Sequence, residues 1–107
     1  MKVGLDVVAI ERVGALDEAA RRKVFHREEM QGASAERLAG VFALKEACKK
    51  IFGPALPWLD VSVSHREDGA PVVVVASRPE AALECSLSHD GGIAAAVVIL
   101  VENPSGR

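Results

Sequence analysis

Aromatic residues are scarce in this sequence, which has three Phe, one Trp and no Tyr among 107 residues. Half of the residues are nevertheless apolar, and Ala and Val supply much of that share. A core of small aliphatic side chains gives a chain of this length only modest stability. We therefore expect one domain, residues 1–102, which associates with copies of itself and is followed by a flexible tail at 103–107.

An excess of charge of one sign is also missing, because the formal net charge is −2 and acidic and basic residues are interspersed. This balance gives no electrostatic footprint for nucleic acid, so we expect no nucleic-acid partner. The longest apolar run, Ile93 to Val101, has the length of a strand and is too short to span a membrane. The start of the chain lacks the basic and apolar regions of a signal peptide.

Only two cysteines are present, Cys48 and Cys85, and they lack the spacing of metal ligands. Each lies within a periodic segment, the first in a predicted helix and the second in a predicted strand. We interpret both as small buried hydrophobes in a reducing cytoplasm, which predicts a cytoplasmic protein.

The periodicity predicts a strand, helices and then further strands. Val3 to Ile10 is rich in Val and apolar except for Asp6, which is typical of a strand. A charged helical pattern follows over 11–30, and a long helix runs from an N-cap at Ser34 to Gly53-Pro54. Further strands are predicted near 59–65, 72–76, 84–88 and 93–101, with one helical turn over 78–82. The sequence thus predicts an α+β fold, in which the long helix packs on a mainly antiparallel sheet.

Two carboxylates lie in unexpectedly apolar settings. Asp6 is in the middle of the first strand, and Glu46 is at the margin of the apolar stripe of the long helix. Such groups need a cation, a metal or hydrogen-bond donors. One alternative is purely structural: Asp6 bonded to a neighbouring turn, and Glu46 paired with Lys50 on the helix surface. The other is a shared Mg²⁺, which takes one or two protein carboxylates and completes its octahedron with water and phosphate oxygens.

Cations and polar groups elsewhere in the sequence suit phosphate binding. Lys45 and Lys50 are close to Glu46 on the helix and would act as point charges. Ser86 to Asp90 ends a strand at a glycine turn with two hydroxyls and an imidazole. A Ser–His–Asp hydrolase is disfavoured, because residues adjacent in sequence cannot form the usual triad and no nucleophile-elbow motif is present.

Motifs in order along nearly the whole chain resemble the holo-acyl-carrier-protein synthase family, the small 4′-phosphopantetheinyl transferases. The most specific one covers residues 38–47 and is completed by Lys50, in a Lys-Glu-Ala-x-x-Lys pattern. A single motif is weak evidence for the family, and the resemblance rests on several motifs in the family's order at near-family spacing. The others are Gly4–Val8, Ile10–Val13, Val24–Phe25 with Glu29–Met30, Trp58–Val61, Asp68–Pro71, Ser86–His89 and Ala94–Val98.

The resemblance implies transfer of 4′-phosphopantetheine from coenzyme A to a serine of an apo acyl or peptidyl carrier protein, with release of 3′,5′-ADP. It implies Mg²⁺ on the coenzyme A pyrophosphate, held by Asp6 and Glu46. Glu46, or a metal-bound water that it orients, would be the base for the serine, and Lys45 and Lys50 would add positive charge at the phosphates. Glu46 and Lys50 are the implied catalytic residues.

The same resemblance assigns the remaining contacts. Ser88 and His89 would contact the nucleotide half of coenzyme A, and Gly69 and Pro71 would line its adenine side. Three arginines of the first helical region would meet the acidic helix of the carrier, namely Arg12, Arg21 and Arg22. The family is typically a homotrimer with sites between subunits, and its carriers belong to fatty acid or polyketide biosynthesis.

The sequence departs from the family pattern at several positions. Ala9 stands where Glu is usual, Val41 replaces the Arg before Phe42, and Ala70 replaces a Lys. The glycine-rich loop after the long helix is shortened to residues 53–57. These losses of charge leave two other hypotheses open: a non-catalytic carrier-binding or assembly protein, and a repurposed enzyme that acts on a carrier-bound substrate. The retained acidic pair favours the transferase.

Overall fold

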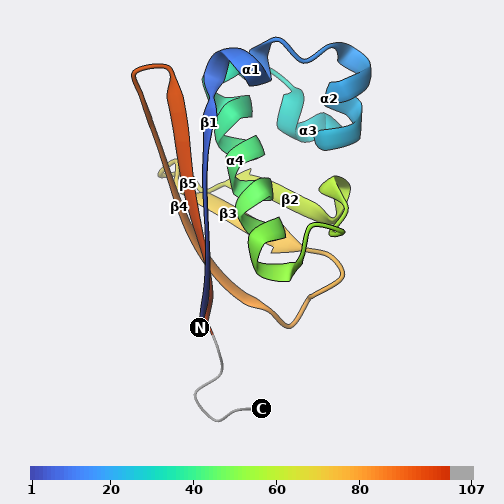
Figure 1. Cartoon of the computed structure of the whole chain (residues 1–107), viewed down its shortest axis with the longest axis vertical. Helices are drawn as coiled ribbons and strands as arrows, with labels where there is room; N and C mark the ends of the chain where they lie inside the picture. The colour runs from blue at the N-terminus through green and yellow to red at the C-terminus, as the bar shows by residue number, and fades with distance from the viewer. Residues whose placement is uncertain (102–107) are drawn as a thin grey trace.

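The computed structural model describes residues 1–101, so residue 102 and the expected tail at 103–107 lie outside the described residues. Figure 1 shows a long helix against a tall curved sheet, with short helices at one end. The elements in chain order are β1 (Lys2–Ala9), α1 (Ile10–Gly14), α2 (Glu18–Val24), α3 (Arg27–Met30), α4 (Ala35–Phe52), the 3₁₀ turn η1 (Trp58–Asp60), β2 (Val61–His65), β3 (Pro71–Val75), β4 (Ala82–Asp90) and β5 (Ile93–Val101).

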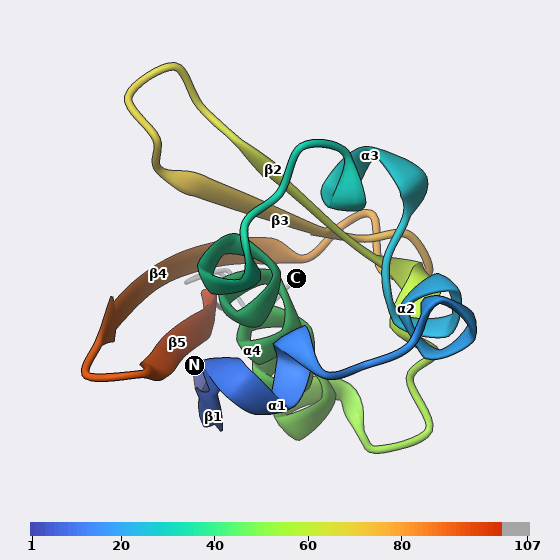
Figure 2. The same ribbon diagram turned by 90° about the horizontal axis from the view of Figure 1, so that it is seen from above.

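Two antiparallel sheets surround α4. One has the strand order β1-β5-β4, with Asp6 opposite Ala96 and Cys85 opposite Val98, and the other is the hairpin β2-β3. Figure 2, which looks down on the molecule, shows α4 enclosed between the three-stranded sheet, the hairpin and the short helices. The predicted α+β fold, with a long helix on antiparallel sheet, is confirmed.

Strand β1 presents alternate residues to α4, as a pleated strand must. Gly4 and Val8 are buried and Asp6 is partly buried on this inner face. A Cβ on Gly4 would lie 2.0 Å from the carbonyl oxygen of Ala47, so only glycine permits this approach of strand and helix. The close contact brings the Asp6 side of β1 against the second half of α4.

The opposite face of the three-stranded sheet is uncovered and is apolar along β1 and β5, while β4 presents polar side chains there. Val3, Leu5 and Val7 point away from α4 and are 55%, 58% and 58% exposed. Ile93 and Val101 at the ends of β5 are also exposed. A row of large apolar side chains on one sheet face is unusual for a monomer and is typical of an association surface.

The structure differs from the sequence prediction over residues 11–30 and 78–82. The first segment forms three short helices, because Asp17 caps α2 through the Ala20 amide and Glu29 caps α3 through the His26 amide. The second segment forms turns closed by Arg78 N–H to Val75 O and Ala81 N–H to Arg78 O. Within residues 1–101, no helix combines the length and apolar character needed to cross a membrane.

Helix α4 is buried over more of its circumference than a single apolar stripe predicts. Four consecutive residues, Gly40 to Ala43, are all buried, and at about 100° per residue they face every side of the helix. The cause is its position, with a sheet on one side and the hairpin and short helices on the others. Ser34 caps its start through the Arg37 amide, as predicted, and Gly53 follows its end at φ 112°.

Candidate active site

Asp6 of β1 and Lys50 of α4 meet although they are 44 positions apart in the sequence. The Lys50 Nζ donates to Asp6 Oδ1 at 3.2 Å and to the carbonyl oxygen of Leu5. The Asp6 side chain is only 14% exposed, whereas Lys50 is 51% exposed. A sheltered carboxylate therefore faces an accessible cation at the junction of strand and helix.

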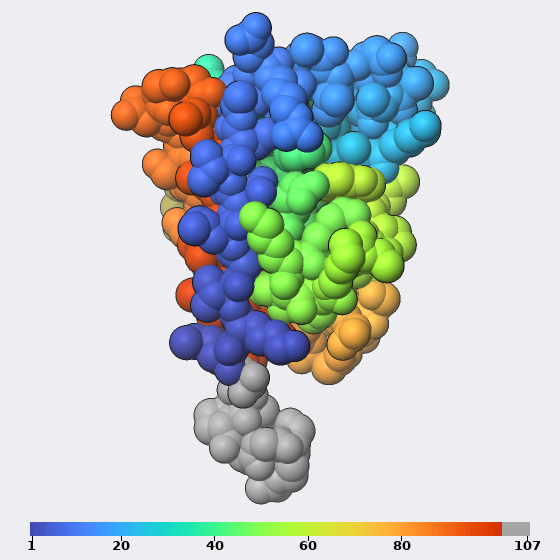
Figure 3. All heavy atoms as spheres, in the orientation of Figure 1, coloured from blue at the N-terminus to red at the C-terminus, as the bar shows by residue number. Residues whose placement is uncertain are grey.

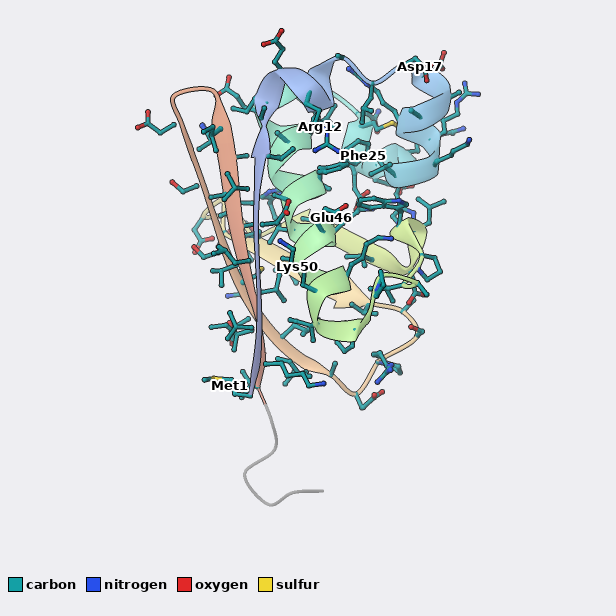
Figure 4. All side chains as sticks on the ribbon, viewed as in Figure 1. Met1, Arg12, Asp17, Phe25, Glu46 and Lys50 are labelled. Atoms are coloured by element: carbon teal, nitrogen blue, oxygen red, sulfur yellow. The ribbon has the colours of Figure 1, made fainter. Side chains whose placement is uncertain are left out.

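Glu46 lies one helical turn before Lys50, so both side chains are on one side of α4. Figure 4 labels both residues on successive turns of the helix beside β1, and Figure 3 shows the two elements side by side on one face of the molecule. Glu46 is partly buried, and the next residue, Ala47, is the one that Gly4 contacts. Helix register thus places Glu46 on the side of α4 that carries Lys50, the residue that contacts Asp6.

The donor chemistry of this junction suits a hard cation. Asp6 and Glu46 supply carboxylate oxygens, and Asp6 already attracts the ammonium of Lys50. In the part of the chain from 1 to 101 no cluster of three or more His, Cys, Asp or Glu side chains forms a closed metal cage. Two carboxylates with open positions match Mg²⁺, which keeps water and substrate oxygens in its coordination sphere. The sharing of one cation by Asp6 and Glu46 stays a prediction.

The prediction that Lys45 acts beside Lys50 at the phosphates does not fit the structure, because the two side chains face different sides of α4. The Lys45 side chain is 0% exposed, and its Nζ forms an ion pair of 2.8 Å with Glu29 Oε1. It also donates to the carbonyl oxygens of Val24 at 2.8 Å and Trp58 at 3.4 Å. The ammonium is thus enclosed by protein acceptors and cannot contact a phosphate in this structure.

The residues expected to contact the nucleotide belong to other strands and turns than the Asp6–Lys50 junction, and all of them except the partly buried Pro71 are exposed. Ser88 and His89 lie near the end of β4, where His89 Nδ1 is 3.5 Å from Glu36 of α4. Gly69, at φ 90°, belongs to the turn before β3, and Pro71 begins that strand. Within residues 1–101, no hydrogen bond or ion pair joins these four residues to Asp6, so their common role stays a prediction.

The three arginines expected to dock a carrier lie in different environments. Arg22 is exposed and pairs with Glu18 on α2, and the Arg12 guanidinium lies 5.9 Å from the ring centre of Phe42. Arg21 donates to the carbonyl oxygens of Leu16 and Gly14. Arg21 therefore fixes the loop between α1 and α2 and is less available to a partner than Arg22.

A cavity of about 460 Å³ lies on another side of α4, between that helix, α3 and β2. Val41 and Val63 form the apolar part of its wall. Arg37 and His65 also line the cavity, and the Arg37 guanidinium donates to His65 Nδ1 at 3.0 Å. Burial and the neighbouring Arg37 lower the pKa of His65 from its ordinary value. Because the imidazole is neutral, it does not balance the charge of the Arg37 guanidinium. Within residues 1–101, Arg37 forms no ion pair with a carboxylate.

Sequence reasoning missed Arg37, His65 and Glu29. Arg37 and His65 are 28 positions apart, and neither belongs to a motif that carries chemistry by itself. Glu29 had a local signal, because it stands three residues after a helix N-cap, the spacing of a capping box. Its pairing with Lys45 depends on tertiary packing, which that local pattern does not contain.

The comparison with family models decides the relationship. The model described as the 4′-phosphopantetheinyl transferase superfamily matches residues 2–98. The chain belongs to this superfamily. The prediction of a phosphopantetheinyl transferase of holo-acyl-carrier-protein synthase type is thereby confirmed at the level of family and enzyme class.

Relatives of this transferase match over nearly their whole length. Holo-[acyl-carrier-protein] synthase of Frankia alni is 37% identical, over 91% of this chain and 93% of that protein. The crystal structure of the Helicobacter pylori holo-[acyl-carrier-protein] synthase in complex with coenzyme A is similar with a TM-score of 0.81 at 29% identity, covering 94% of this chain and 100% of that one. A Bacillus anthracis holo-(acyl-carrier-protein) synthase in complex with CoA (3′,5′-ADP) has a TM-score of 0.80 at 26% identity, over 92% of this chain and 93% of that one.

Proposed function

We propose that this transferase moves 4′-phosphopantetheine from coenzyme A to a serine hydroxyl of an apo acyl carrier protein. The observation that carries the proposal is the Asp6–Lys50 contact, with Glu46 one turn away, at the junction of β1 and α4. Support comes from similarity to holo-[acyl-carrier-protein] synthases, including one solved with coenzyme A. Fatty acid or polyketide biosynthesis in the cytoplasm is the setting that we propose.

Mg²⁺ is the cofactor that fits the two carboxylates, and Asp6 and Glu46 would hold it. When bound, it would supply Lewis-acid stabilisation of the negative charge on the pyrophosphate of coenzyme A. The ammonium of Lys50 lies beside Asp6. Lys50 is half exposed and flexible, so it can turn from Asp6 to a phosphate oxygen when substrate arrives.

The chain's own groups then have distinct roles in transfer. Glu46 accepts the proton of the carrier serine, directly or through an ordered water, as the serine oxygen bonds to the phosphorus that bears pantetheine. The bond from that phosphorus to the bridging oxygen breaks, and 3′,5′-ADP leaves with the electron pair. Lys50 stabilises the charge that develops on the phosphate oxygens, because its ammonium is positively charged and lies beside the site.

The nucleotide half of coenzyme A would be held by Gly69, Pro71, Ser88 and His89. Family members usually have cations at the positions of Val41 and Ala70, and this chain has none there. We propose that Arg37 compensates, since its guanidinium lies in the same cavity wall as Val41 and, among residues 1–101, pairs with the neutral imidazole of His65 and with no carboxylate. Lysine or arginine contacts are the usual means of holding phosphate.

The cavity and the Asp6–Lys50 junction lie on different sides of α4. Glu46 follows Arg37 by nine positions, which places the two about 180° apart around a helix. One coenzyme A molecule would therefore reach both only by bridging two copies of the chain. The uncovered apolar face formed by Val3, Leu5 and Val7 supplies a surface for such copies, and we propose a homotrimer with shared sites.

The carrier would dock on the short helices beside the site. Arg22 and Arg12 are exposed cations there, and an acidic carrier helix would be attracted to them. Arg21 would act indirectly, because its hydrogen bonds to Leu16 and Gly14 hold the loop that separates α1 from α2. The docking assignment thus rests mainly on Arg12 and Arg22.

Calorimetry with coenzyme A separates this function from the alternatives. The proposal requires binding that strengthens when Mg²⁺ is added and that weakens in Asp6→Asn and Arg37→Gln. A carrier-binding protein without catalysis would bind apo carrier and would show no heat with coenzyme A. A repurposed enzyme would bind coenzyme A or a carrier-bound thioester without consuming the coenzyme, so nucleotide release measured in parallel distinguishes it.

A further inference from the structure

The most enclosed charged group of the described residues is the ion pair between Lys45 of α4 and Glu29 of α3. The Lys45 side chain is 0% exposed and that of Glu29 is 3% exposed, at an Nζ–Oε1 distance of 2.8 Å. Within the described part of the chain, neither residue forms a hydrogen bond or ion pair with Asp6 or Lys50. The proposed chemistry therefore leaves this pair without a direct role.

Every polar atom of the pair has a protein partner. The ammonium donates to Glu29 and to the carbonyl oxygens of Val24 and Trp58. The carboxylate accepts from the amides of His26 and Val63, each at 2.8 Å. Four separate segments, the end of α2, the start of α3, η1 and β2, are thus bonded to one side of α4.

The bonds to Lys45 are directional in a way that apolar packing is not. Hydrogen bonds from one Nζ to three acceptors allow little rotation of the helix about its axis. Burial lowers the pKa of Lys45 from its ordinary value, and the hydrogen bond and charge of Glu29 act against that shift. Replacing a buried ion pair by apolar groups is often neutral for stability, so stability alone does not account for this one.

Glu46 is the next residue along the helix, and it projects about 100° further around the axis. A small rotation of α4 would move its carboxylate away from Asp6 of β1. On the strand side, the contact of Gly4 with Ala47 sets the separation of helix and strand. That contact fixes a distance, and the Lys45 bonds on the other side fix a rotation.

We infer that Lys45 and Glu29 are positioning residues, whose buried ion pair sets the rotation of α4 that turns Glu46 toward Asp6. The inference rests on the proposed function, in which these two carboxylates share a divalent cation. It assigns Lys45 to alignment of the site, while Lys50 acts on substrate. Comparable supporting groups behind metal ligands change metal affinity by about 10–100-fold when removed.

The test is a double variant, Glu29→Gln with Lys45→Met, which removes both charges, keeps the volumes and retains an acceptor for one of the two backbone amides. Thermal unfolding by circular dichroism checks the fold, and Mn²⁺ binding is measured by electron paramagnetic resonance in the whole protein without carrier. We expect a folded protein whose Kd for Mn²⁺ is about tenfold weaker or more. Lys49→Met, on the same helix and over the Trp58 ring, is the matched control and should leave the Kd unchanged.

Glu29→Gln alone is the second variant, for use if the double variant does not fold. Its amide still accepts from His26 or Val63, and it should show the same direction of change in Kd. A folded variant that binds Mn²⁺ within twofold of the unaltered protein would overturn the inference alone, with the proposed function intact. Failure of the unaltered protein to bind Mn²⁺ would overturn the metal site itself, and the inference with it.

Discussion

Gly4 of β1 lies against the backbone of Ala47 in α4, where an added Cβ would be 2.0 Å from the carbonyl oxygen. The strand can approach the helix this closely only because residue 4 has no side chain. Asp6 is two residues further on the same face of the strand, and Glu46 precedes Ala47. The position of both carboxylates therefore depends on this contact.

Gly4→Ala should move β1 away from α4 and destabilise the fold by about 1–3 kcal/mol, the usual cost of overpacking. Urea unfolding measures the free energy of unfolding. The affinity for Mn²⁺ reports whether Asp6 and Glu46 can still hold one ion. Gly14→Ala is the control, because a Cβ there would meet only the Ala35 side chain at 3.5 Å, an ordinary contact. Equal stability of the two variants would contradict the role given to Gly4.

Lys50→Ala should lower kcat for transfer by about 10²-fold or more, because it removes a cation that acts on the developing phosphate charge. The KM for carrier should change little, since Lys50 lies away from the short helices. Glu46→Gln should reduce turnover further while the circular dichroism spectrum stays unchanged. Transfer kinetics at saturating coenzyme A measure both kcat values. A Lys50→Ala variant with full kcat would refute the catalytic role of Lys50.

Arg22→Glu should raise the KM for carrier several-fold without altering kcat, because it reverses an exposed charge on the docking surface. The effect should shrink as salt concentration rises, since the interaction is between exposed charges. Lys2→Glu makes the same charge change at the start of β1 and serves as control. Figure 4 shows the neighbouring Met1 at the opposite end of the molecule from Asp17, the cap of α2. A similar KM in the two variants would argue against docking on α2.

The contrast between Lys45 and Lys50 shows how far sequence goes toward the site. The Lys-Glu-Ala-x-x-Lys pattern and the lone Asp6 predicted the strand–helix junction, and the structure brings Asp6 and Lys50 together. Lys45 belongs to the same sequence pattern and is adjacent to Glu46, yet its side chain is buried with that of Glu29. A helix enclosed on several sides has no single polar face, so spacing along it cannot tell a core lysine from a site lysine.

The region from 11 to 30 illustrates a second limit. Its periodicity is helical throughout, but Asp17 and Glu29 end and restart the helix by bonding to backbone amides. Such side chains compete with the helix for its own donors. The Arg37–His65 contact was also beyond prediction, because it joins the first turn of α4 to the end of β2.

His65 should titrate below the ordinary histidine range, because burial and Arg37 both lower its pKa. Between that lowered pKa and the unfolded value near 6.5, the unfolded chain binds more protons than the folded one, so stability should fall as pH falls through this window. The NMR shift of the His65 ring proton measures the titration. Arg37→Gln should move the pKa upward, and Arg22→Gln, a distant control, should not.

Intact-protein mass spectrometry of an apo acyl carrier protein tests the central claim most directly. The purified protein is incubated with coenzyme A, Mg²⁺ and a panel of apo carriers, with Glu46→Gln in parallel. We predict that at least one carrier gains the mass of phosphopantetheine, that 3′,5′-ADP appears in equal amount, and that Glu46→Gln gives neither. An unmodified panel, under conditions where a known holo-acyl-carrier-protein synthase modifies the same carriers, would contradict the proposed transfer.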